Sequence, residues 1–303
     1  MFKMRTLRRD SCCGRPAFTL VETLVSISIL ALLAALTMAG VQKVRAAAAR
    51  TACQNNLRQL ALALHQYHGA NGVLPAGVSG KDTKTGQPFM GWHVRILPYV
   101  EQSAMHEQAV AAYKQDKNFL NSPPHVGLER AVKLFGCPTD PRTLSPQLAN
   151  DKTIRGTTAY LGNEGLSSFR MEGVLFLDSA VKLTDITDGT TNTLLIGERP
   201  PSADLALGWW YAGWGQDQDG EAEMVMGVRV KNRMGGRYNC PVGPHHFGPG
   251  KITDDCATFH FWSLHAGGAH FAHADGSVRF MAYSADAILP ALATRAAGDT
   301  VPE

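Results

Sequence analysis

The C-terminal third of the sequence is rich in side chains that can bind metal ions. Its six histidines, together with one of its aspartates, form a group of possible ligands: His245, His246, His260, His265, His270, His273 and Asp275. Imidazole and carboxylate groups are ligands for zinc and other transition metals. In a regular strand, however, His270 and His273 would project from opposite faces. We therefore favour a structural role over a metal site, with His265 hydrogen-bonded to the Asp275–Gly276 turn and fixing its geometry.

A short acidic segment, DQDGEAE at 217–223, has the pattern of half a calcium-binding loop. Asp217, Asp219 and Glu221 alternate in it, and Gly220 permits a tight turn. The rest of the twelve-residue calcium pattern, including its terminal bidentate glutamate, is missing. A solvated acidic turn is therefore the favoured interpretation, and a calcium site is the alternative.

Four aromatic residues crowd into a single short segment: Trp209, Trp210, Tyr211 and Trp214. Rings at this density can form a platform for a sugar or a peptide. More often such a cluster belongs to the core and leaves one ring exposed. We favour the core interpretation and keep a binding face as the alternative.

No catalytic motif accompanies these residues. The sequence lacks a GxSxG elbow, an HExxH helix, a P-loop and a dinucleotide fingerprint. We therefore expect no enzymatic activity and no cofactor. A secreted hydrolase is the least favoured of the functions considered.

The charge of the chain is concentrated at its start. Of 303 residues, 29 are Lys or Arg and 26 are Asp or Glu, which gives a net charge of +3. Residues 1–17 hold five bases and one acid, so the remainder is close to neutral. Nucleic-acid binding needs a basic patch on the folded part. We therefore expect no nucleic-acid partner.

This basic leader precedes an uncharged run of 18 residues, Leu24–Val41. The run reaches the lower length limit for a membrane-spanning helix. Because lysine and arginine stay on the cytoplasmic side, everything after Lys43 is expected outside the cytoplasm. A plain anchor explains the length but not the carboxylate of Glu22. A secretory signal cleaved near Thr37-Met38-Ala39 explains the basic start, but it also leaves Glu22 unexplained.

The segment FTLVE, Phe18 to Glu22, resembles the signature of type IV prepilins and pseudopilins. The resemblance implies cleavage by a prepilin peptidase between Ala17 and Phe18, followed by methylation of the new amino terminus. The family usually has glycine before the cut; this chain departs from that pattern with Ala17, which is also a small residue. An unpaired carboxylate in a bilayer costs about 2.5–3.5 kcal/mol on insertion scales. In the family the new amine of one subunit meets the acid of its neighbour, so Glu22 is expected to favour assembly in register.

Helix-forming residues continue beyond the apolar run. One helical face carries Leu57, Leu60, Ala61, Leu64, His65 and His68. Gly69, Asn71–Gly72 and Pro75 mark the end of this helix, which is predicted to run from about Phe18 to His68.

We predict an α+β, pilin-like fold with the helix laid over an antiparallel sheet. Its parts are a leader (1–17), a transmembrane and assembly helix (18–42), the soluble half of the helix (43–72), an extracytoplasmic domain (73–290) and a frayed tail (291–303).

Shorter segments separated by turn residues follow from residue 73 onward. Residues 91–102 are predicted to form a short strand that leads into a helix at about 99–118. Further strands are predicted within 133–141, 157–165, 173–199 and 209–214. The clearest hairpin lies near the C-terminus, with Gly267–Gly268 and Asp275–Gly276 as tight turns.

Five further motifs resemble a large bacterial family of unknown function: CQNNLRQLALALHQYHGANGVLPAG, WHVRILPYVEQ, FGCPTD, ITDGTTNTLLIGE and SLHAGGAHFAHADGSVRF. Members join a prepilin-type N-terminus to a domain that ends in a "prepilin-type processing-associated" element, a histidine followed after nine residues by Asp-Gly. His265 and Asp275–Gly276 match that spacing. The resemblance covers nearly the whole chain and implies no biochemical activity.

Four of the six cysteines lie beyond the apolar run, and four cysteines allow three disulfide pairings. Cys53 and Cys137 belong to two of the family-like motifs. We predict that they pair and that Cys240 and Cys256 form a second bridge. A bridge that closes a long loop contributes about 2–4 kcal/mol. Buried free thiols are the alternative, and no CxxC or CxxH spacing favours a zinc site.

These observations together predict an assembly protein, a pseudopilin-like subunit of a type II secretion or type IV pilus-like system. Its expected partners are prepilin peptidase, other pilin-like subunits and the inner membrane. The chain would cross that membrane once and place its soluble domain outside the cytoplasm, in a periplasmic or surface filament. The alternative is a membrane-anchored module that binds a glycan or peptide through Trp209, Trp210 and Trp214.

Overall fold

The computed structural model describes residues 19–299 of the chain. Ala17 and Phe18, the predicted processing positions, therefore lie outside the described residues. The chain divides into two compact units, Met1–Arg45 and Ala46–Glu303. The first contains the start of the long helix, and the second contains the sheet with everything packed on it.

Helices and strands alternate irregularly along the chain. The α-helices are α1 (Leu20–Asn71), α2 (Trp92–Ile96), α3 (Ser103–Gln115) and α4 (Leu289–Ala293). Short 3-10 helices are η1 (Leu97–Val100), η2 (Val126–Glu129), η3 (Lys133–Phe135), η4 (Pro141–Thr143), η5 (Leu183–Asp185), η6 (Gly235–Arg237), η7 (Asp255–Phe259) and η8 (Tyr283–Ile288). The strands are β1 (Gln147–Leu148), β2 (Ile154–Arg155), β3 (Tyr160–Gly165), β4 (Leu194–Glu198), β5 (Val225–Gly227), β6 (Gly268–His273) and β7 (Val278–Ala282).

The long helix α1 ends where its sequence signals predicted. Gly72 follows its last residue at φ +75°, a left-handed conformation that glycine adopts without a steric penalty. The backbone N–H of Gly72 donates to His68 O at 2.7 Å. Together these features close the last turn of α1 before Pro75.

Five strands form the main sheet, in the order β5-β3-β4-β6-β7. The β3–β4, β4–β6 and β6–β7 pairs are antiparallel. The β3–β5 pair is parallel, so the sheet is antiparallel except at that edge. A parallel pair needs a long crossover connection, which here runs through β4 and the aromatic segment. The α+β class itself is confirmed.

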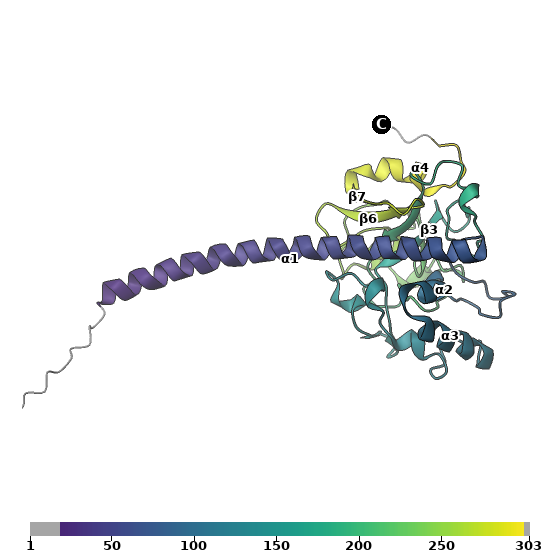
Figure 1. Cartoon of the computed structure of the whole chain (residues 1–303), viewed down its shortest axis with the longest axis horizontal. Helices are drawn as coiled ribbons and strands as arrows, with labels where there is room; N and C mark the ends of the chain where they lie inside the picture. The colour runs from purple at the N-terminus through teal and green to yellow at the C-terminus, as the bar shows by residue number, and fades with distance from the viewer. Residues whose placement is uncertain (1–18, 300–303) are drawn as a thin grey trace, which may run out of the picture. The chain divides into compact units, whose positions relative to one another are not determined.

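Both faces of the central strands are buried. Every residue of β3, β4 and β6 is buried. On one face, Cys53, Leu57 and Leu64 of α1 belong to a core that includes Tyr160 and Ile196, and Figure 1 shows the C-terminal half of α1 lying across the sheet. The opposite face belongs to a second core, built from Leu161, Leu194, Phe247, Phe259, Phe261, Phe271 and Leu289. The sheet therefore sits between α1 and the C-terminal segments.

The predicted strand in 91–102 was wrong, because this segment folds into α2 and η1 and then α3. Trp92, Val94 and Ile96 alternate in the sequence, which suggested a strand. In the structure these three residues and the intervening His93 are all buried. A short run that is buried on every side carries no periodicity that separates helix from strand.

Strands were also predicted wrongly at 133–141 and 209–214. The first segment forms η3 and η4, because Pro138 and Pro141 lack the N–H groups that a strand pair requires. The second has only isolated bridges, such as Trp209 with Thr157. Consecutive burial of its side chains holds it in place, and it adds no strand to the sheet. Within 173–199 only β4 is a strand.

The C-terminal hairpin was predicted correctly, with β6 and β7 joined through Asp275–Gly276. The tail predicted from residue 291 was wrong at its start, since residues 291–293 belong to α4. Leu292 is 5% exposed and Ala293 is fully buried. Arg295 donates through Nη1 to Met171 O at 2.7 Å and to Gly173 O at 2.8 Å. Burial and hydrogen bonding therefore fix this segment to the domain.

Candidate functional site

The first candidate site is the N-terminal part of α1. Its large apolar side chains are 48–78% exposed: Leu20, Val21, Leu24, Val25, Ile27, Ile29, Leu30, Leu32, Leu33, Leu36, Met38, Val41 and Val44. Among residues 19–299, α1 is the one helix long and apolar enough to cross a membrane. A soluble monomer rarely exposes an apolar surface of this extent. This segment therefore requires lipid or neighbouring subunits around it.

Glu22 lies in the first turn of this helix and makes a capping box with Thr19. Its Oε2 accepts from Thr19 N at 2.9 Å and from Thr19 Oγ1 at 2.8 Å. In return, Glu22 N donates to Thr19 Oγ1 at 3.3 Å. Such reciprocal bonds satisfy N–H groups at a helix start. The sequence analysis missed this local role, although the spacing T-x-x-E signals it.

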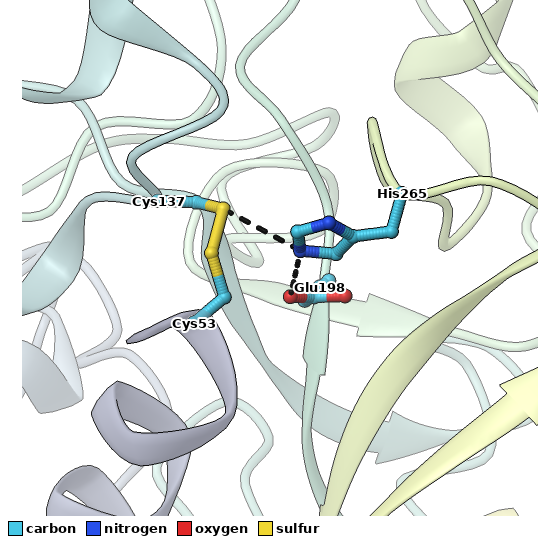
Figure 2. Close-up of side chains that lie close together, drawn as sticks. All are labelled: Cys53, Cys137, Glu198 and His265. Carbon is cyan, nitrogen blue, oxygen red and sulfur yellow. Dashed lines mark hydrogen bonds and ion pairs between the residues drawn. A yellow bond between two sulfur atoms is a disulfide. The ribbon is translucent and has the colours of Figure 1, made fainter. Parts of the chain in front are cut away.

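The second candidate site is a buried cluster around a disulfide. Cys53 in α1 is bonded to Cys137, which follows η3. His265, from the loop before β6, places Nε2 3.7 Å from Cys137 Sγ and 3.4 Å from Glu198 Oε1 at the end of β4. Figure 2 shows this imidazole directed at both the sulfur and the carboxylate. Four segments far apart in the sequence thus converge at one buried point.

Glu198 is held from its other side by His270 in β6. The backbone N–H of His270 donates to Glu198 Oε2 at 2.7 Å, and His270 Nδ1 lies 3.2 Å from the same oxygen. Burial opposes ionisation of Glu198, but the hydrogen bonds from His265 and His270 outweigh it and lower the pKa of this carboxyl. A charged carboxylate is therefore stabilised between two histidines. Glu198 is the last residue of the family-like motif ITDGTTNTLLIGE, but it was not predicted as part of a site.

The predicted contact between His265 and the Asp-Gly turn was wrong. The Asp275 carboxylate accepts from Ser277 N at 2.8 Å, and Gly276 N donates to His273 O at 2.9 Å. Gly276 has φ +82°, so the turn is closed by its own backbone. His265 is turned away from it toward Glu198 and the Cys53–Cys137 disulfide.

The acidic segment binds an arginine. Arg233 Nη2 lies 2.5 Å from Asp219 Oδ2 and 2.8 Å from Glu221 Oε2, and Arg233 Nε lies 3.1 Å from Asp217 Oδ2. Asp219 is 9% exposed and Glu221 1% exposed, so the expectation of a solvated turn was wrong. The three predicted calcium ligands share one guanidinium, which supplies the positive charge that a cation would bring.

Glu164 adds a further acid beside this group. Burial, together with the charge of Glu221, holds the pKa of Glu164 well above its ordinary value. Neither carboxyl oxygen of Glu164 has a hydrogen-bond partner among the described residues. Glu164 is therefore neutral when Glu221 is ionised.

The aromatic residues separate into core and surface. Trp209 and Trp210 are buried, and Trp210 Nε1 donates to Arg130 O at 2.6 Å. Trp214 is 42% exposed and packs edge-on against Phe119, with ring centroids 5.3 Å apart. The expected arrangement of a core with one exposed ring is confirmed, and Trp209 and Trp210 are unavailable to a ligand.

Both predicted disulfides form. Cys53–Cys137 and Cys240–Cys256 have S–S distances of 2.03 and 2.04 Å. Disulfides persist in oxidising compartments outside the cytosol. The pairing therefore fits a domain that is exported.

Comparison with known protein families identifies the class of protein to which this chain belongs. The "Prokaryotic N-terminal methylation motif" matches residues 15–38, and the described residues carry a long apolar N-terminal helix and an α+β domain. This combination defines a pilin-like protein with a prepilin-type N-terminus, anchored in the membrane by one helix. The chain belongs to the family described as "Protein of unknown function (DUF1559)", which matches residues 42–287. Neither a curated protein nor a solved structure matches the chain.

Proposed function

We propose that this protein is a pseudopilin-like subunit of a type II secretion or type IV pilus-like assembly. The observation that carries the proposal is the exposed apolar surface of α1, which bears a single ionisable residue, Glu22, near its start. Prepilin peptidase would cut between Ala17 and Phe18, and the new amine would be methylated. The amine of one subunit would then neutralise Glu22 of the next within the membrane.

Two further observations support this proposal. The methylation motif spans the cut and the start of the apolar helix. The two disulfides favour a soluble domain outside the cytoplasm. Nothing in the described residues matches a catalytic motif, so the proposed role is structural.

N-terminal sequencing of the membrane-bound protein tests the processing step. A mature chain that begins with methylated Phe18 is the expected result. A chain that begins at Gly40 would indicate secretion by a conventional signal. A chain that retains Met1 through Ala17 would overturn the subunit proposal, because no amine would then lie at the depth of Glu22.

Substitutions at Glu22 separate charge pairing from helix capping. Glutamine at the third helical position preserves a capping box but removes the charge. Pairing between subunits therefore predicts that Glu22→Gln loses co-assembly as severely as Glu22→Ala does, while both variants still insert. Capping alone predicts that Glu22→Gln assembles normally and that Thr19→Ala is defective. Crosslinking of subunits in membranes, with insertion measured in parallel, distinguishes the two outcomes.

A second candidate function is ligand binding at Trp214. This ring borders a cavity of about 610 Å³ whose charged lining residues are two lysines, Lys81 and Lys117, and one acid, Asp82. An aromatic ring flanked by two lysines suits an anionic sugar or an acidic peptide. On a glycan and peptide array, Trp214→Ala should abolish binding, while Phe169→Ala, which removes an exposed ring elsewhere (72% exposed), should not. If Trp214→Ala still binds the array as strongly as Phe169→Ala does, this site is ruled out.

A further inference from the structure

The cluster around the Cys53–Cys137 disulfide has the donor set of a metal site. Cys53, Cys137, Glu198 and His265 each direct one ligand atom to a common point, and these atoms all lie within 4.8 Å of one another. All four residues are at least 94% buried, since none exceeds 6% exposure. Two sulfurs, one imidazole nitrogen and one carboxylate oxygen are the ligands that zinc takes in four-coordinate sites.

The distances already present suit a tetrahedral ion. Zinc bonds of about 2.0–2.3 Å place neighbouring ligand atoms about 3.3–3.8 Å apart. His265 Nε2 lies 3.4 Å from Glu198 Oε1 and 3.7 Å from Cys137 Sγ. The His265 nitrogen is therefore already spaced from the carboxylate and from one sulfur as zinc ligands are, whereas the two sulfurs must separate on reduction.

Neighbouring groups orient these ligands in the way metal sites require. The backbone N–H of His270 donates to Glu198 Oε2 at 2.7 Å, and His270 Nδ1 lies 3.2 Å from that oxygen and 3.3 Å from Oε1, the oxygen that His265 approaches. The Thr139 hydroxyl lies 3.0 Å from Cys137 Sγ and can donate to a thiolate. Such partners hold ligands in place and tune their basicity. A small cavity of about 10 Å³ lies beside the cluster and is lined in part by Cys137, Thr139 and Glu198, but not by Cys53 or His265.

We propose that the reduced form of this protein binds one zinc ion through Cys53, Cys137, His265 and Glu198. A dithiol reductant would convert the protein disulfide to two thiols and would itself become a disulfide. Zinc would then displace the two thiol protons and bind both thiolates. The zinc ion and the disulfide are thus alternative crosslinks between Cys53 in α1 and Cys137 in the rest of the domain. The reduced chain would hold zinc; when a small-molecule disulfide takes up two electrons and two protons and becomes two thiols, the protein disulfide re-forms and the zinc ion is released.

The test uses the full chain in detergent, with Cys12, Cys13, Cys240 and Cys256 replaced by serine so that only two thiols remain. A water-soluble phosphine reduces the disulfide under anaerobic conditions and is converted to its oxide by water. Zinc is then added, excess ion is removed, and bound metal is measured by mass spectrometry. Cobalt(II), added in a parallel sample, reports thiolate ligation through its visible absorption.

The expected result is about one zinc per reduced chain and none per oxidised chain, with a tetrahedral thiolate spectrum for cobalt. His270→Ala should weaken zinc binding about 10–100-fold, because His270 orients Glu198. His265→Gln and Glu198→Gln should weaken it further. His246→Gln, which changes an exposed histidine elsewhere, is the matched control and should leave binding unchanged.

Circular dichroism keeps the test decisive if reduction unfolds the chain. Zinc that restores the native spectrum of the reduced chain would support the proposal, because metal binding is then coupled to folding. The proposal is overturned if the reduced chain, whether folded or unfolded, takes up no zinc. It is also overturned if His265→Gln and Glu198→Gln bind zinc as tightly as the parent.

Discussion

Arg233 Nη2 lies 2.8 Å from Glu221 Oε2, and this pair anchors a group of otherwise unpaired acids. Asp217 and Asp219 contact the same guanidinium. Glu221 is 1% exposed, so water cannot replace the arginine. Asp219 and Glu221 therefore belong to a buried ionic network, whereas the Asp217 side chain is 56% exposed. The network depends on one arginine that lies ten or more positions further along the chain.

Removing the Arg233 charge should strongly destabilise the domain. Arg233→Met keeps most of the side-chain volume but leaves buried carboxylates unpaired, which costs about 3–5 kcal/mol in comparable cases. Arg170→Met breaks an exposed pair with Glu172, in which Arg170 is 62% exposed, and should cost at most about 1 kcal/mol. Urea unfolding of both variants provides the comparison. Equal losses of unfolding free energy in the two variants would show that the buried pairs of Arg233 stabilise the domain no more than an exposed ion pair does.

His93 should make the fold sensitive to acid. Burial lowers the pKa of this histidine to about 3, and His93 Nε2 lies 3.1 Å from Tyr160 O as a donor. The unfolded chain takes up this proton near pH 6.5, whereas the folded chain does not. The free energy of unfolding therefore falls as pH drops from about 6.5 toward 3, by up to about 1.4 kcal/mol per pH unit.

His93→Gln isolates this contribution, because glutamine can still donate to Tyr160 O and does not titrate in this range. The variant should lose less stability than the wild type between pH 6.5 and 4. Unfolding free energies measured at several pH values in this window check the difference. Parallel pH profiles for the two proteins would mean that His93 is not the group responsible.

The packed face of α1 can be tested with two leucines that lie close together in sequence. Leu57 is fully buried, and Leu62 is 53% exposed. Leu57→Ala should cost about 2–5 kcal/mol, because it removes buried methyl groups and leaves a cavity. Leu62→Ala should change stability by no more than about 0.5 kcal/mol. A large effect at Leu62 would place the buried face elsewhere on the helix.

The two disulfides should differ in their contribution to stability. Cys53–Cys137 joins residues 84 positions apart, and Cys240–Cys256 joins residues 16 positions apart. In the chain-entropy model a loop of about 15 residues gives about 3 kcal/mol and one of about 100 residues about 4.7 kcal/mol. Replacing both members of the first pair with serine should therefore cost about 1.5 kcal/mol more than replacing the second pair. Chemical denaturation of the two double variants measures this difference, and the opposite order would contradict the model.

Local features of the fold could be predicted from sequence because they depend on neighbouring residues. Gly72 and Pro75 end α1 near the predicted position, and the Asp275–Gly276 turn joins a hairpin whose residues alternate. The failures at 91–102 and 209–214 have one cause. Trp92 and Trp210 lie in segments that are buried on all sides, so no polar face remains in the sequence to give a period.

The membrane segment and the prepilin-type signature with Glu22 could be recognised in the sequence, because they depend only on the charge and hydrophobicity of consecutive residues. Contacts between side chains that are far apart in the sequence became visible only in the tertiary structure. It brought Glu198 to His265 and the Cys53–Cys137 disulfide, and it placed Arg233 among the acids where a calcium ion was considered. Some of these contacts join residues that are more than a hundred positions apart in the sequence. They depend on how strands and loops pack around a shared core, and no local pattern records that packing.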